Sequence, residues 1–359
     1  MTKVTFITDP LVTTAGAVRP AILLARELRR RRGTPAIVTP RSDGRIAESL
    51  REEGIEIKDV GPRFSFIPSS PTLDAWARCL IRNKTLRGND GLVVNSSSCL
   101  IAPAHVYYAQ GLMTRTLNDM LSVNRSIYHY AYHLLKRPLI GLEKRLAHQF
   151  DESSGLFVAN SAYCATMYQE WGIKVSKIIC PPLDCELFKP STANPSADYV
   201  LTTFGKYGKE GNFQIIKAIA DAGVKIKVFG EVSHVPGSLE KISNFTFVGR
   251  VSDQELAMLY SNALYTLFAF SHEPFGYIPV ESMSCGTPVL TFNRQGPSET
   301  VVNGRTGWLA DSNEELVALA VRCWDKGYDS RFRTACRERA IEYDIKTKFE
   351  EWNRIFDRD

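Results

Sequence analysis

Two glutamates lie eight residues apart in the segment SHEPFGYIPVESMSCGTPVLTF, residues 271–292. Glu273 comes just before a helical pattern that runs from Gly276 to Cys285, and Glu281 lies within that pattern, a little over two helical turns after Glu273. Apolar runs on both sides of the segment predict strands. Ligands of open α/β sheets bind beyond the carboxyl ends of strands, so we expect both carboxylates to face one crevice there.

The start of this helical pattern suits an anion. Phe275, Gly276 and Tyr277 form the predicted first turn, where backbone N–H groups without helical partners attract a phosphate or another negative group. A purely structural interpretation also stays open. Glu281 would then be a surface helix residue, and Glu273 an acid favoured by the helix dipole.

This segment resembles the signature of the retaining glycosyltransferases of family 4, also described as glycosyl transferases group 1. That signature has a glutamate, Pro/Gly-Phe-Gly, seven residues between two glutamates, and a turn of the type CGTPV, all of which stand in residues 273–289. The resemblance implies that Glu273 contacts the transferred sugar and that Glu281 binds the ribose hydroxyls of a nucleotide. It also implies that the backbone of Pro274 to Tyr277 meets the sugar or its diphosphate.

A second match is FGKYGKEGNFQIIKAI, residues 204–219. The family has Gly-Arg here and a Lys-Gly several residues later, which neutralise the donor diphosphate. The resemblance therefore implies that Gly205, Lys206 and Lys209 bind the diphosphate. Lys206 replaces the arginine and would act as a point charge, and Lys209 lies in a shorter loop that reads Lys-Glu-Gly instead of Glu-Lys-Gly. A solvated basic turn is the alternative.

A third match is RQGPSETVVNGRTGWLA, residues 294–310, which looks like the family's Gly-Gly-x-Pro-Glu segment. Gly296 would let the backbone approach a sugar or phosphate closely. Glu299 is expected to orient the loop, and Asn303-Gly304 predicts a turn.

The first half matches the family less closely. Gly16 is the one clear glycine of the first strand-to-helix loop, where the family has two, and it is expected near the donor phosphate; a plain loop is the alternative. Gln110 stands where many members have a histidine, and it cannot exchange protons as an imidazole does, although it can bind a sugar hydroxyl. His105 lies at the wrong strand end for catalysis. Asn160-Ser161 is expected to cap a helix, and Asp184 to fix a turn.

Two further groups of residues have both a functional and a purely structural interpretation. His129 and His133 are one helical turn apart, but no third ligand accompanies them, so no metal site is expected. Basic residues could touch anionic lipid headgroups, as for family members that act on lipid-linked acceptors, or could simply line solvated helix faces. They are Arg29 to Arg32, Arg125, Lys136, Arg137, Lys144 and Arg145.

The elements that must position these residues alternate along the chain. Apolar runs such as 4–8, 36–39, 105–109, 199–204 and 288–292 predict strands separated by helices, which is typical of parallel sheets. A proline-rich window, 181–195, predicts a linker. The expected fold is α/β, and the resemblance specifies GT-B, with two Rossmann-like doubly wound domains facing across a cleft. The expected domains are an acceptor-side domain (1–185), a sugar-nucleotide domain (186–340) and a C-terminal helix (341–359) packing back on the first.

Composition limits the function classes. The net charge of +5 is too small for a nucleic-acid-binding protein, and the start MTKVTFITDP reads as a strand and not as a secretory signal. Eight scattered cysteines without a CxxC pair indicate reduced thiols. We therefore expect a cytoplasmic protein, with peripheral contact at the inner membrane face as a further hypothesis.

Together these features predict a metal-independent hexosyltransferase that retains the anomeric configuration and has no cofactor. The donor would be a sugar nucleotide of UDP or GDP type, and the acceptor a glycan or lipid-linked sugar. A non-catalytic sugar-nucleotide-binding subunit is the main alternative, because Gln110 and the lone Gly16 depart from the family. An epimerase or phosphorylase on the same fold is a second alternative.

Overall fold

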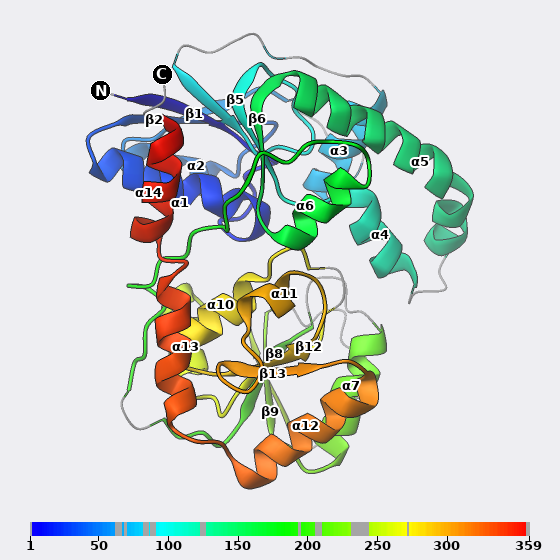
Figure 1. Cartoon of the computed structure of the whole chain (residues 1–359), viewed down its shortest axis with the longest axis vertical. Coiled ribbons are helices and arrows are strands. Elements are labelled where there is room, and N and C mark those ends of the chain that lie inside the picture. The colour runs from blue at the N-terminus through cyan, green and yellow to red at the C-terminus, as the bar shows by residue number, and fades with distance from the viewer. Residues whose placement is uncertain are drawn as a thin grey trace. The chain divides into compact units, whose positions relative to one another are not determined.

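The computed structural model describes residues 2–61, 67, 70–81, 86, 91–122, 127–192, 195–204, 210–230, 244–270 and 273–356. The chain divides into two compact units (Figure 1). Unit 1 comprises Met1–Thr114, Leu135–Pro182 and Ile345–Asp359, and unit 2 comprises Arg115–Leu134 and Leu183–Asp344. The sequence-based boundaries were expected after residues 185 and 340.

Unit 1 is built on a parallel sheet with the strand order β3-β2-β1-β4-β5-β6-β7 in its described part. Phe6 of the central strand pairs with Ile37 on one side and Val94 on the other. Strands buried on both faces read as continuous apolar runs, which is why most of them could be predicted. The strands are β1 (Lys3–Ile7), β2 (Thr34–Thr39), β3 (Glu56–Asp59), β4 (Leu92–Asn95), β5 (Ala104–Ala109), β6 (Ser154–Ala159) and β7 (Lys177–Ile178).

Helices pack on this sheet through apolar faces. The C-terminal helix α14 lies beside α1 (Figure 1), and its Trp352 ring meets Tyr108 of β5 edge-on, with ring centroids 5.0 Å apart. The helices are η1 (Gly16–Val18), α1 (Arg19–Arg30), α2 (Gly44–Glu52), α3 (Pro71–Ile81), α4 (Met113–Ser122), α5 (Ile127–Glu152), α6 (Ala162–Gln169) and α14 (Ile345–Phe356). By the division above, most of α4 and the first turns of α5 count with unit 2.

Unit 2 repeats the plan with the described strand order β10-β9-β8-β11-β12-β13, again all parallel. Its strands are β8 (Val200–Thr203), β9 (Ile226–Phe229), β10 (Phe245–Gly249), β11 (Thr266–Phe268), β12 (Val289–Phe292) and β13 (Gly307–Ala310). Its helices are α7 (Glu210–Asp221), α9 (Asp253–Asn262), α10 (Tyr277–Ser284), α11 (Gln295–Thr300), α12 (Asn313–Lys326) and α13 (Arg331–Ile341).

Each sheet has one point where the strand order reverses. In unit 1 this point lies between β1 and β4, and in unit 2 between β8 and β11. The crossover helices leave toward opposite faces there, and a crevice opens beyond the carboxyl ends of the two strands. These two reversal points are therefore where ligands are expected. Within the described residues, no helix has the length and apolar composition needed to cross a bilayer.

Candidate functional site

The loop that leads from β11 to α10 carries Glu273, and its backbone is held on both sides. The Glu273 N–H donates to the side-chain Oε1 of Gln295 at 2.8 Å. The Glu273 carbonyl accepts from the N–H of Gly296 at 3.0 Å. The first residues of α11 thus fix the position of Glu273 at the reversal point of the unit 2 sheet.

Gly296 also brings α11 into direct contact with the next peptide of this loop. A Cβ at Gly296 would lie 2.3 Å from the Pro274 carbonyl oxygen and 2.5 Å from the Phe275 nitrogen. Backbone atoms cannot move aside as a flexible side chain can, so only glycine fits here. The close approach that the structure has at Gly296 is to the chain's own backbone. The expected approach to a sugar or phosphate stays a prediction.

Gly276 directly precedes α10 and has a left-handed conformation, with φ +87°. Its missing side chain leaves room for Pro297, whose Cγ would lie 3.1 Å from a Cβ. No described side chain caps the N-terminus of α10. Phe275 is buried, and its ring meets Tyr277 and Tyr343 edge-on at 5.5 and 5.7 Å. The first turn of the helix is thus held by ring packing instead of a capping side chain.

Glu281 lies within α10 and is only 5% exposed. Its Oε2 accepts a hydrogen bond of 3.0 Å from the hydroxyl of Tyr260, a fully buried residue of α9. A carboxylate carried into the protein in this way costs free energy unless it is hydrogen-bonded. The structure therefore excludes the interpretation of Glu281 as a surface helix residue. Sequence reasoning missed Tyr260, which no motif marks.

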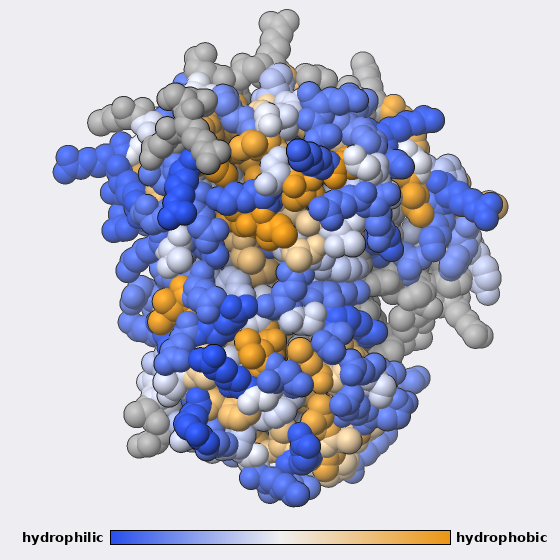
Figure 2. Space-filling view, in the orientation of Figure 1, coloured by the Kyte–Doolittle hydropathy of each residue, from blue (hydrophilic) through white to orange (hydrophobic). Residues whose placement is uncertain are grey.

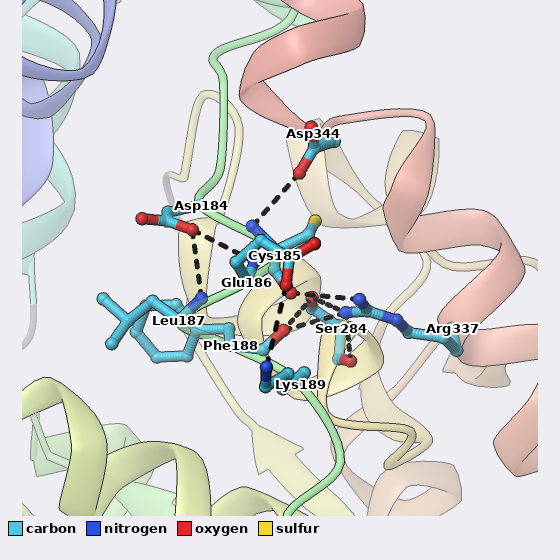
Figure 3. Close-up of polar contacts among 9 residues, drawn as sticks. All are labelled: Asp184, Cys185, Glu186, Leu187, Phe188, Lys189, Ser284, Arg337 and Asp344. Atoms are coloured by element: carbon cyan, nitrogen blue, oxygen red, sulfur yellow. Dashed lines mark hydrogen bonds and ion pairs between the residues drawn. The ribbon is translucent and has the colours of Figure 1, made fainter. Parts of the chain in front are cut away.

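The C-terminal end of α10 is tied to the segment 184–189 by one arginine (Figure 3). Arg337 of α13 donates from Nη1 to the carbonyls of Phe188 and Ser284, both at 2.9 Å, and from Nη2 to the Cys185 carbonyl at 3.0 Å. The Ser284 hydroxyl also donates to the Phe188 carbonyl. Because Ser284 ends the helix that carries Glu281, this cluster holds that helix in place.

The same close-up shows how the segment begins (Figure 3). The Asp184 carboxylate accepts from the N–H groups of Glu186 and Leu187, both at 3.0 Å. The Cys185 N–H donates to Asp344 at 3.3 Å. The expectation that Asp184 fixes this turn is confirmed.

Gly205, Lys206 and Lys209 lie outside the described residues. Thr203 ends β8 and Phe204 follows it, so the chain enters this loop at the reversal point of the sheet. The assignment of the three residues to the donor diphosphate stays a prediction.

The reversal point of unit 1 carries a buried polar group that sequence reasoning missed. Asp9 follows β1, and its carboxylate accepts from the Ser98 N–H at 2.8 Å and from the Ser97 hydroxyl at 3.1 Å. Burial raises the pKa of Asp9, and the hydrogen bonds from Ser98 and Ser97 oppose that rise. The sequence does contain a signal for this group: an acidic residue directly follows an apolar strand, and serines follow β4.

Gly16 starts η1 with φ +67°, and the space next to it is open. Gln110 donates from Nε2 to the carbonyls of Ala17 at 2.7 Å and Ser96 at 3.4 Å, so it ties loops of unit 1 together. His105 accepts from the Val93 N–H at 3.0 Å, which is a structural role. Ser161 caps α6 by accepting from the Cys164 N–H, as expected.

A small cavity in unit 1 borders Ser98 and Glu143, with about 10 Å³ of space for a water-sized sphere. That volume admits one water molecule at most, so it is no sugar site. Glu143 of α5 accepts from the N–H groups of Met113 and Thr114 and thereby caps α4; burial raises its pKa. Among the described side chains, no three His, Cys, Asp or Glu gather as a metal site.

The comparison with protein families gives a match that falls within unit 2. Residues 186–342 match the family model described as glycosyl transferases group 1. An alpha-1,3/1,6-mannosyltransferase of Neurospora crassa is 47% identical over 57 residues, which are 16% of this chain and 12% of that protein. A probable sucrose-phosphate synthase of Thermosipho melanesiensis is 29% identical over 137 residues, which are 36% of this chain and 30% of that protein. The chain thus matches less than a third of the length of these curated relatives.

Solved structures resemble the whole chain. Anabaena Alr3699/HepE in complex with UDP and glucose has a TM-score of 0.70 at 18% identity, covering 100% of both chains. WaaG, a glycosyltransferase involved in lipopolysaccharide biosynthesis, has a TM-score of 0.71 at 16% identity, covering 99% of this chain and 100% of that chain. Likeness at such identities shows the fold alone, and it confirms the expected α/β fold of GT-B type.

Proposed function

We propose that this chain, whose residues 186–342 match the family model of the glycosyl transferases group 1, is a hexosyltransferase. It would move a hexosyl unit, with retention at the anomeric carbon, from a nucleoside diphosphate sugar to a glycan or a lipid-linked sugar. One observation carries the proposal. Glu273 and the buried Glu281 lie on one loop–helix element at the reversal point of the unit 2 sheet, in the pattern of the family.

In this proposal Glu281 accepts hydrogen bonds from the ribose hydroxyls, and the Tyr260 hydroxyl holds the carboxylate in place. A buried carboxylate fixed by such a hydrogen bond is preorganised for this contact. Glu273 lies nearer the start of α10 and would face the transferred sugar. The UDP and glucose in the Alr3699/HepE complex support a donor of UDP type; a GDP-type donor is the other candidate.

The proposed reaction depends more on the stabilisation of developing charges than on covalent bonds between the protein and the substrate. The bond between the anomeric carbon and the diphosphate oxygen breaks, and its electron pair stays on the diphosphate. Lys206, Lys209 and the N-terminal amides of α10 would neutralise that growing negative charge. Glu273 would stabilise the positive charge that develops on the sugar ring. With cationic side chains in this role, the proposed reaction uses neither a metal nor another cofactor.

The acceptor hydroxyl attacks the same face of the anomeric carbon, and its proton passes to an oxygen of the departing diphosphate. This route requires no histidine, which agrees with Gln110 in the position where many members have one. We assign the acceptor to unit 1, beyond the carboxyl ends of the strands at the reversal point of its sheet.

A screen of sugar nucleotides tests the donor half of the proposal. We expect either UDP- or GDP-linked hexoses to raise the melting temperature by several degrees, and ADP-glucose not to do so. A ligand at one hundred times its Kd stabilises the folded state by about 2.7 kcal/mol. Release of nucleoside diphosphate only when an acceptor is present would then establish transfer, since release without acceptor would indicate hydrolysis and no release would indicate a binding subunit.

We also propose peripheral contact with anionic lipid at the inner face of the membrane, through α5. In the basic run 29–32, Arg30 and Arg31 are already paired, since they lie 2.7 and 2.8 Å from Glu27. Helix α5 instead exposes 82% of Leu134 near exposed basic side chains, and Figure 2 shows hydrophobic and hydrophilic side chains interspersed over α5. An apolar residue among basic ones is the pattern of interfacial helices. The exposed basic residues are Arg137, Lys144 and Arg145.

Co-sedimentation with vesicles tests this contact. Binding to anionic vesicles should be strong at low salt and weak at high salt, because screening shortens the reach of the charges. Leu134→Glu should lower vesicle binding about tenfold, since it removes the buried apolar area and adds repulsion. The control is Met258→Glu, at an apolar residue of α9 that is half-exposed, and it should bind as the wild type does. If Leu134→Glu binds vesicles as strongly as the wild type does, α5 is not the surface that contacts the lipid.

A further inference from the structure

Gln295 is the first residue of α11 and has a backbone conformation that L-residues rarely adopt. Its φ is +62°, in the left-handed region, where a side chain with a Cβ costs about 1 kcal/mol or more. Such strain persists only where the surroundings hold it in place. Here Gly296 and Pro297, the next two residues, pack against the loop 273–276 and leave Gln295 little freedom.

The two ends of the Gln295 amide differ in their partners. Oε1 must be the atom that faces the Glu273 N–H, because only an oxygen can accept that hydrogen bond. The NH2 group therefore points away from the Glu273 backbone. Within the part of the chain that the structure describes, the Gln295 side chain has one hydrogen bond, the one that Oε1 accepts.

We propose that the Nε2 group of Gln295 donates a hydrogen bond to a hydroxyl of the transferred hexosyl unit and is a specificity-determining residue. The inference rests on the proposed function. Glu273 is the residue assigned to the sugar, and Gln295 is bonded directly to its backbone. The nucleotide end of the donor is assigned to Glu281, further along α10, so the amide lies on the sugar side.

The strained backbone fits this role. A glycine would adopt φ +62° without cost but would offer no amide. Glutamine at this position has an unfavourable backbone conformation, but it places an N–H donor group beside Glu273. The same side chain thus serves twice, because Oε1 positions the Glu273 loop while Nε2 contacts the ligand.

The test compares the binding of a sugar nucleotide with the binding of its nucleoside diphosphate. UDP-glucose with UDP, and GDP-mannose with GDP, are the probes, measured by calorimetry on the full chain. In Gln295→Gly, affinity for the sugar nucleotide that the wild type binds should fall about tenfold, while affinity for the free diphosphate should change less than twofold. This variant relieves the strain and should fold at least as well as the wild type.

Gln295→Glu separates ligand contact from loop positioning. Glutamate keeps an oxygen that accepts from the Glu273 N–H but has no N–H to donate. It should therefore lose sugar-nucleotide affinity as the glycine variant does. Wild-type affinity in Gln295→Glu would show that the side chain only positions Glu273, and would overturn the proposal.

Donors that lack single hydroxyls sharpen the result. The wild type should bind one of the deoxy-hexose donors about tenfold more weakly than the parent, and Gln295→Gly should bind that donor and the parent alike. Asn293→Ala, two residues before Gln295 and at an exposed side chain, is the control and should bind as the wild type does.

Three further results would overturn the inference. Equal weakening of the free diphosphate and the sugar nucleotide in Gln295→Gly would place the contact on phosphate. Unchanged binding of both would leave no contact at all. If the wild type binds none of these probes, the proposed function is overturned as well. If the wild type binds them and Gln295→Gly binds them equally well, only the present inference is overturned.

Discussion

Glu273→Gln should lower the turnover number by two to three orders of magnitude and leave the fold intact. Glutamine matches glutamate in size but lacks the charge that the proposal sets against the positive sugar ring, and loss of one preorganised electrostatic contact costs that much in known enzymes. The backbone contacts of residue 273, to Gln295 and Gly296, do not depend on its side chain. Release of nucleoside diphosphate under saturating donor and acceptor is the measurement.

The control for this variant is Glu338→Gln, on the same unit. Glu338 of α13 is 62% exposed and lies 3.7 Å from Arg305, so its charge contributes little. Both variants should melt within about two degrees of the wild type. If Glu273→Gln keeps more than a third of the wild-type turnover, Glu273 is not the residue that stabilises the sugar ring.

Most strands of both sheets could be predicted because buried parallel strands are continuous apolar runs. Three short strands could not. Glu56–Asp59 (β3) is an edge strand with one buried residue, and β7 has two residues, so neither has a pattern to detect. Gly307–Ala310 (β13) is also an edge strand and is mostly buried, but it begins with a glycine directly after the Asn303-Gly304 turn, so its short apolar run reads as the continuation of that turn.

Likewise, only some residues of the candidate site could be predicted from the sequence. Glu273 and Glu281 could be found because their spacing belongs to one local element. Tyr260 and Asp9 reach their partners from elements distant in the sequence, and only the folded sheet brings them together. The left-handed backbone of Gln295 was also beyond prediction, since only glycine and asparagine signal that conformation in a sequence.

Arg337→Ala should produce the largest loss of stability among the single substitutions considered. It removes the Arg337 donors from the carbonyls of Cys185 and Ser284, whereas the Phe188 carbonyl keeps the Ser284 hydroxyl as a donor. A carbonyl left without a donor in a partly buried place costs about 1 to 3 kcal/mol, and water that enters will recover part of that. We therefore expect the free energy of unfolding to fall by about 3 kcal/mol, measured by denaturant titration. Arg331→Ala on the same helix is the control, because Arg331 is 89% exposed and its one ion pair with a described residue is the pair with Asp329.

The effect of Arg337 should extend to the donor site, because Ser284 ends the helix that carries Glu281. Arg337→Lys keeps the positive charge but has one nitrogen in place of a planar fork, so it cannot bond to Cys185 and Ser284 together as arginine does. We expect Arg337→Lys to recover part of the stability and still to bind the sugar nucleotide several-fold more weakly than the wild type, as calorimetry would show. If the lysine variant is less stable yet binds the donor as the wild type does, the cluster around Arg337 stabilises unit 2 without positioning Glu281.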